Sequence, residues 1–124
     1  MEIVGCQRQD AYAILRATLH ALRDRLTVEE TAQLAAQLPM LIRGLYFEGW
    51  DPTGKPVKER HREDFLGHIQ PEIERYNIDP ERAVRAVFRV VANRVSEGEI
   101  QDVAHVLPRE IRELWPSTVV RGSY

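Results

Sequence analysis

The chain has 124 residues, a formal net charge of −2 and 44% hydrophobic residues, which is enough for one domain to bury a core without disulfides or metal. A charge so close to zero excludes the global positive field that drives non-specific nucleic-acid binding, and the lone Cys6 excludes an intramolecular disulfide. With no signal-peptide pattern and no apolar run long enough to span a bilayer, we expect a cytoplasmic protein that contacts neither nucleic acid nor membrane.

Capping residues and helical periodicity predict three helices within the first 46 residues. After Asp10, apolar residues recur at steps of three and four, which predicts an amphipathic helix over about residues 11–25. Thr27 and Glu30 form a capping box, so a second helix is predicted over residues 28–37. Pro39 suits the first turn of a third, short helix that ends near Tyr46.

The middle of the chain differs in character from this first segment. Residues 47–59 contain two proline turns and predict an ordered arm, and Trp50 in that arm has a large apolar area that favours docking. Residues 60–76 have apolar residues at helical spacing, but Pro71 should kink this extra helix or split it.

Three further helices are predicted before the tail. Asp79 followed by Pro80 is typical of a helix start, and the apolar spacing after it is helical as far as Val95. Ser96 and Glu99 form another capping box, Pro108 another first-turn proline, and the tail covers residues 116–124.

Residues 10–46 align with residues 79–115 at an offset of 69 without a gap. Caps, breaks and core positions coincide, which is typical of a repeated supersecondary unit. Identical residues at the offset are Asp10, Arg16, Ala17, Arg25, Glu30, Ala35, Leu38, Pro39, Ile42, Arg43 and Leu45, which align with Asp79, Arg85, Ala86, Arg94, Glu99, Ala104, Leu107, Pro108, Ile111, Arg112 and Leu114.

We therefore expect an all-α fold: one domain over residues 1–124, a bundle of about six to seven helices built from two similar three-helix units with a pseudo-twofold relation. The units are unequal, because the helix over residues 60–76 precedes only the second one. The apolar face of the first unit then needs a cover, which could be the tail, the Trp50 arm or a second copy of the protein.

Four motifs carry a resemblance to a known family. They are LRDRLT at residues 22–27, AQLP at 36–39, GLYFEGWDP at 44–52 and EIRELW at 110–115. Together they resemble the bacterial domain-of-unknown-function 2267 family over about residues 10–116. The resemblance implies a small, all-helical bacterial cytosolic protein and brings no catalytic residues with it. Longer members begin with the leading helix in both halves, whereas this chain has it only in the second.

Two groups of side chains could bind a small ligand or an ion. One group lies at helical spacing and could hold zinc or iron, namely His61, Asp64, His68 and Glu72. The exposed face of an ordinary amphipathic helix has the same pattern of residues. Lys55 and Lys58 belong to a basic run beside Trp50 that could bind an anion, although a solvated loop explains it too. A pocket between the units could also be lined by Arg43, Tyr46 and Trp50.

Other repeated residues are interpreted as structural. Arg16 and Arg25 align with Arg85 and Arg94, and Glu30 and Glu99 could form ion pairs with these arginines at the helix corners, next to the equivalent Pro39 and Pro108. No catalytic motif and no cofactor signature stands out, so we expect no cofactor.

The sequence favours a non-enzymatic protein-interaction or regulatory module that associates with a protein partner or with itself. The exposed edge of the first unit and the Trp50 arm are the expected contact surface. A ligand binder or small enzyme using the pocket between the units is the alternative, and a metal-binding helical protein is the second alternative.

Overall fold

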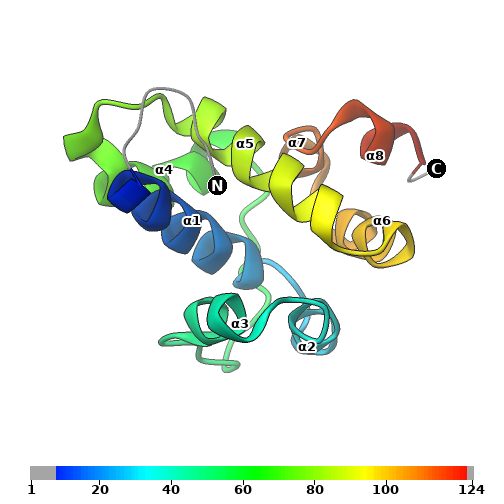
Figure 1. The fold of residues 1–124 in the computed structure, drawn as a ribbon. Coiled ribbons are helices and arrows are strands. Elements are labelled where there is room, and N and C mark those ends of the chain that lie inside the picture. Colours follow the sequence, from blue (N-terminus) through cyan, green and yellow to red (C-terminus); the bar gives the residue numbers. More distant parts are fainter. Residues whose placement is uncertain (1–7, 123–124) are drawn as a thin grey trace.

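The computed structural model describes residues 8–122, which form α-helices joined by turns and one long arm, with one 3-10 turn and no strand in that range (Figure 1). The helices are α1 (Arg8–Arg23), α2 (Val28–Ala35), α3 (Met40–Phe47), α4 (Arg62–Ile73), α5 (Pro80–Arg94), α6 (Glu97–Val106), α7 (Arg109–Arg112) and α8 (Ser117–Gly122), and the 3-10 turn η1 (Glu74–Tyr76) follows α4. The expectation of an all-α fold is confirmed.

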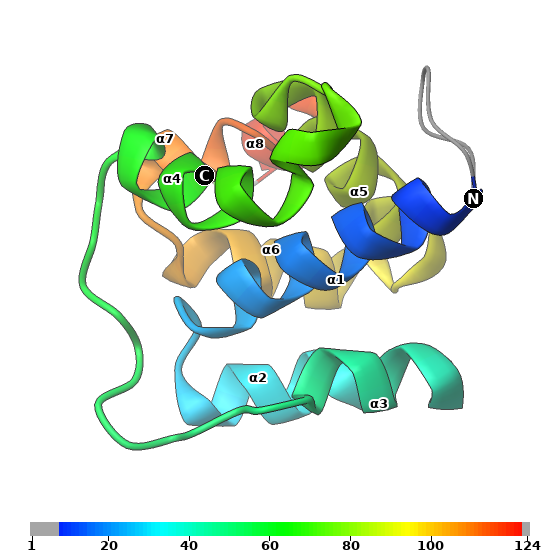
Figure 2. The ribbon, with the colours of Figure 1, turned by 90° about the vertical axis from the view of Figure 1, so that its left-hand side faces the viewer.

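Helices α1 and α5 lie at the centre and pack on each other and on α4 (Figure 1). Below α1, helices α2 and α3 form a separate layer, α7 packs on α4, and α8 packs on α6. Figure 2 shows the arm after α3 running along one side of the molecule to reach α4.

Both units contribute to one continuous core. At its centre the ring of Phe88 from α5 stacks on Trp115, with ring centroids 4.1 Å apart. The ring of Phe65 from α4 lies 6.1 Å from Phe88 on the other side. All three side chains are almost completely buried, so this aromatic column joins α4 and α5 to the end of the second unit.

The starts of α2 and α6 follow the caps expected from the sequence, whereas α1 begins at Arg8, before the expected cap Asp10. Thr27 Oγ1 accepts a hydrogen bond from the Glu30 amide at 3.1 Å, and Ser96 Oγ accepts one from the Glu99 amide at 3.3 Å. These two caps are 69 residues apart, and each satisfies an amide that has no partner within its own helix.

One arginine in each unit makes the same pair of hydrogen bonds. Arg43 donates from Nε to the Ala35 carbonyl at 2.9 Å and from Nη2 to the Leu38 carbonyl at 3.1 Å. Arg112 donates to the carbonyls at the same offset, those of residues 104 and 107, at 3.0 and 3.1 Å. The guanidinium thus binds two carbonyls at a helix end in both units. Duplication of an ancestral unit stays our interpretation of this correspondence.

Two details differ from the expected elements. Helix α4 runs unbroken through Pro71, because this residue lies in the last turn of the helix and removes a single amide donor there; the change to the 3-10 turn comes only at Glu74. The tail contains a helix, α8, that the sequence did not predict, and its Val119 is buried next to α6.

No helix within the described range is both long enough and apolar enough to cross a membrane.

Candidate functional site

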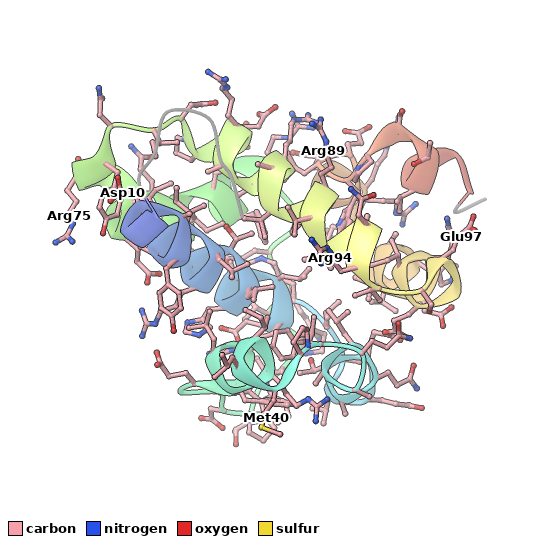
Figure 3. All side chains as sticks on the ribbon, viewed as in Figure 1. Asp10, Met40, Arg75, Arg89, Arg94 and Glu97 are labelled. Atoms are coloured by element: carbon pink, nitrogen blue, oxygen red, sulfur yellow. The ribbon has the colours of Figure 1, made fainter. Side chains whose placement is uncertain are left out.

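An apolar groove of about 600 Å³ opens between α1, α5 and the turn from α2 to α3. Its floor is made by Leu19 and Val91, which are almost fully buried, and Leu15, Ile42 and Val90 form half-buried walls. The residues that line it are Leu15, Leu19, Gln37, Leu38, Pro39, Ile42, Val90, Val91, Asn93, Arg94 and Val95. Figure 3 labels Arg94, which projects from the end of α5 near this opening.

Large apolar side chains stand exposed on the helices that form this groove. Met40 and Leu41 at the start of α3 are 83% and 88% exposed, and Tyr12 on α1 is 56% exposed. Met40 is labelled in Figure 3 on the outer side of the lower layer. We call the groove together with these three side chains the open face of the first unit. Its apolar character is unusual for a surface that only meets water.

The tail and the arm, two of the three expected covers of the first unit, contribute no residue to the lining of the groove. Helix α8 packs on α6, which belongs to the second unit. The arm is fixed below α1 by the Val57 amide, which donates to the Asp24 carbonyl at 2.7 Å, and Trp50 packs on Phe47 with ring centroids 5.3 Å apart. A second copy is the expected cover that remains.

The three residues expected to line a pocket between the units have other contacts. Arg43 is held by the two carbonyls described above. Tyr46 is fully buried, its hydroxyl donates to the Thr31 carbonyl at 3.2 Å, and burial raises its pKa. Trp50 packs on Phe47 in the arm. The structure therefore does not assemble these side chains into one ligand site.

Basic side chains instead gather around a different cleft, of about 540 Å³, between the arm and the turn from α6 to α7. Of the basic run expected to bind an anion, Lys58 and Arg60 line this cleft, whereas Lys55 is not among its lining residues. Arg25, Arg109 and Arg112 complete its basic lining. We call it the basic cleft.

The match to a family model gives the first independent information about this chain. The model for an uncharacterised conserved protein, DUF2267, matches residues 1–114. The chain belongs to the DUF2267 family. Comparison with curated proteins found no match.

The four residues proposed as metal ligands in this DUF2267 protein are not gathered into one site. His68 Nε2 lies 2.9 Å from Glu59, and Glu72 pairs with Arg16 at 3.6 Å. Among residues 8–122 the histidine and carboxylate side chains close enough to share a metal ion are His61, Glu63 and Glu110, not the expected set with Asp64.

The contact between His61 and Glu110 belongs to the start of α4. Glu110 accepts a hydrogen bond from the Arg62 amide at 3.0 Å and lies 3.1 Å from His61 Nδ1. The backbone hydrogen bond from Arg62, followed by the contact with His61, lowers the pKa of Glu110, and Glu110 in turn raises the pKa of His61. Glu110 therefore acts as the N-terminal cap of α4 from another helix.

The expected ion pairs of Glu30 and Glu99 with the repeated arginines are wrong. Arg16 pairs with Glu48 and Glu72, and Arg85 binds the Glu81 carboxylate at 3.0 Å. Arg25 donates to Glu59 at 2.7 Å, and Arg94 projects beside the groove.

Glu30 and Glu99 interact with each other between α2 and α6. Each is 8% exposed, and one buried oxygen of each lacks a hydrogen-bond donor among the described residues. Burial, then a hydrogen bond with Glu30 and its charge, raises the pKa of Glu99 to about 8. Two buried carboxyl groups in contact are stable when they share one proton, because both cannot ionise together.

The sequence interpretation missed the groove, because its residues have the same apolar spacing as the core. One signal was nevertheless present in the alignment of the two units. Met40 and Leu41 occupy the positions that correspond to Arg109 and Glu110 at the 69-residue offset. A charged pair in one unit and an apolar pair in the other indicates that the two equivalent surfaces have different neighbours.

Proposed function

We propose that this DUF2267 protein is a non-enzymatic protein-interaction module that binds another protein molecule through the open face of its first unit. The observation that carries the proposal is the apolar groove, together with the exposure of Met40, Leu41 and Tyr12 on α1 and α3, two of the helices that contribute to its lining. Apolar patches of this kind on a folded monomer mark interaction sites far more often than they mark chance exposure.

The chemistry of the open face supports binding rather than catalysis. Gln37, Asn93 and Arg94 are the polar residues that line the groove, and none of them is a usual general base or nucleophile. The groove floor consists of aliphatic side chains, which contribute to binding by removal of apolar area from water.

A second copy of the chain is the simplest protein that could bind there. Many soluble proteins form symmetric dimers in which the same patch of each subunit meets its counterpart. An apolar groove beside protruding apolar side chains is compatible with such self-complementary contact.

Chemical labelling of single cysteines tests whether the open face is covered. In a Cys6→Ser background, Met40→Cys and Arg109→Cys each place one thiol at equivalent positions of the two units, and the side chains they replace are 83% and 87% exposed. The maleimide reaction rate of each is measured in cells of the source organism and in the purified protein. We expect the thiol at position 40 to react several-fold more slowly in cells, while the control at position 109 reacts equally in both.

The pattern of protection also identifies the partner. Protection at position 40 that grows with concentration in the purified protein, together with a dimer in analytical ultracentrifugation, would identify a second copy. Protection in cells alone would identify another protein. Equal labelling of both positions in cells would refute the interaction module.

The basic cleft favours a second candidate function, anion binding. Five cationic side chains surround it, and Arg25 is 4% exposed with its Nε atom unpartnered among the described residues. Such a cluster of positive charge attracts an anionic group such as phosphate or carboxylate. We expect inorganic phosphate to bind here and to bind more weakly after Lys58→Ala, as isothermal titration calorimetry would show. Unchanged affinity in this variant would exclude the cleft.

A further inference from the structure

Helix α4 occupies a well-defined place against helices of both units. It packs on α1, α5 and α7. The ring of Phe65 lies next to Phe88 of α5, and the guanidinium of Arg25 lies over the Phe65 ring, 5.1 Å from its centroid. Phe65, Ile69 and Ile73 are fully buried at successive steps of four residues, so one stripe of α4 makes the contact.

The groove corresponds to the same place on the first unit. At the 69-residue offset, Phe88 corresponds to Leu19 and Arg25 corresponds to Arg94, and both of these residues line the groove. The 69-residue offset relates α1 to α5 and α3 to α7. The helices that contact α4, which are α1, α5 and α7, therefore correspond to α5, α1 and α3. Residues of these three helices make up most of the groove lining. The groove is therefore the counterpart of the α4 site without its helix.

The two sites differ in charge at the end where α4 begins. Arg62 in the first turn of α4 pairs with Glu81 and Glu113, each at 3.4 Å, and its amide is capped by Glu110. At the 69-residue offset the corresponding residues of the first unit are Tyr12 for Glu81, Gly44 for Glu113 and Leu41 for Glu110. Three carboxylates are thus replaced by two large apolar side chains and a glycine.

We infer that the groove accepts one amphipathic helix from another polypeptide, with a large apolar anchor between Leu19 and Arg94 and an apolar first turn against Tyr12 and Leu41. This inference rests on the proposed function and specifies its partner. The helix should be about as long as α4, with apolar residues at steps of four, as in other helix-in-groove complexes. A basic first turn is disfavoured, because its charge would find no carboxylate at the three exchanged positions.

The α4 sequence itself supplies the probe. We would compare two fluorescent peptides of residues 60–76, one native and one with Arg62→Leu, whose first turn matches the apolar residues around the groove. Fluorescence anisotropy gives their affinities for the whole protein, and amide chemical shifts locate the bound peptide. We expect the Arg62→Leu peptide to bind more tightly and to shift the amides of Leu15, Ile42 and Arg94.

Leu41→Glu should reverse this preference. It restores in the first unit the carboxylate that Glu110 provides in the second, and the exposure of Leu41 leaves folding unaffected. We expect the Arg62→Leu peptide to bind this variant about tenfold more weakly, because the new carboxylate would lose its water against an apolar first turn. The native peptide should bind the variant more tightly than it binds the wild-type protein. The matched control, Glu110→Gln, should leave the preference between the peptides unchanged.

The inference is overturned if neither peptide binds, if Leu41→Glu affects both peptides equally, or if the shifts locate the peptide at Phe88 instead of the groove. A dimer of the purified protein that buries Met40 would also overturn it in favour of a second copy. The proposed function fails separately, when the thiol at position 40 reacts freely in cells. If neither peptide binds while the thiol at position 40 is protected in cells, the interaction module stands and a helical partner is excluded.

Discussion

Replacement of Glu99 by glutamine should change how the stability of the protein depends on pH. Burial and the contact with Glu30 raise the pKa of Glu99 from its usual 4.5 to about 8. The folded protein then keeps a proton on this carboxyl group over a pH range in which the unfolded chain has released it. The contribution of this carboxyl group to the free energy of unfolding is therefore fully present below pH 4.5 and is lost as the pH rises towards 8.

The expected magnitude follows from the difference in bound protons. One extra proton in the folded state lowers the free energy of unfolding by about 1.4 kcal/mol for each pH unit. Because Glu30 shares the proton and Asp102 and Tyr46 also lie close enough to interact, we expect a smaller net fall, of about 1 to 3 kcal/mol between pH 5 and pH 7.5.

In Glu99→Gln the side-chain amide can donate to Glu30 without a titrating proton, so this fall should largely disappear. Urea unfolding from pH 5 to pH 8 measures the difference, and Glu97→Gln, at an exposed position in the first turn of the same helix, is the control. If wild type and Glu99→Gln lose stability in parallel as the pH rises, the shared proton does not exist and the reasoning is refuted.

Three further predictions concern the core, the corners and the open face, and urea unfolding at pH 6 checks each of them. Phe65→Ala should destabilise the fold by about 3–5 kcal/mol, because it removes a fully buried ring in contact with Phe88. Arg43→Lys and Arg112→Lys should each cost about 1–2 kcal/mol, because an ammonium group cannot bridge two carbonyls as the guanidinium fork does. Leu41→Ser should change stability by less than about 0.5 kcal/mol, because this side chain is 88% exposed, and a larger loss would mean that it contributes to the fold.

Local signals in the sequence predicted the helices and their caps well. Thr27, Ser96 and Asp79 cap the helices that follow them, because capping chemistry depends on residues only three positions apart. Helix α8 escaped prediction, since a six-residue segment has too little periodicity to be distinguished from a turn.

Contacts between distant segments could not be predicted in the same way. Glu30 looked like a partner for an arginine, because the alignment gives the positions of charges but not the direction in which each helix face points. In the fold α2 and α6 pack on each other, which brings Glu30 to its own counterpart Glu99. Whether two residues at corresponding positions meet depends on how α2 and α6 pack, which the sequence pattern does not contain.

The groove is a second feature that the sequence pattern could not predict. Leu19 and Phe88 are equivalent core positions, and both are fully buried. Phe88 is covered by α4, whereas Leu19 forms part of the floor of an open groove. What separates the two sites in the sequence is the exchange of Glu81, Glu110 and Glu113 for Tyr12, Leu41 and Gly44. In the second unit these carboxylates bind Arg62 at the start of α4, and their absence from the first unit agrees with the apolar first turn that we propose for the partner helix.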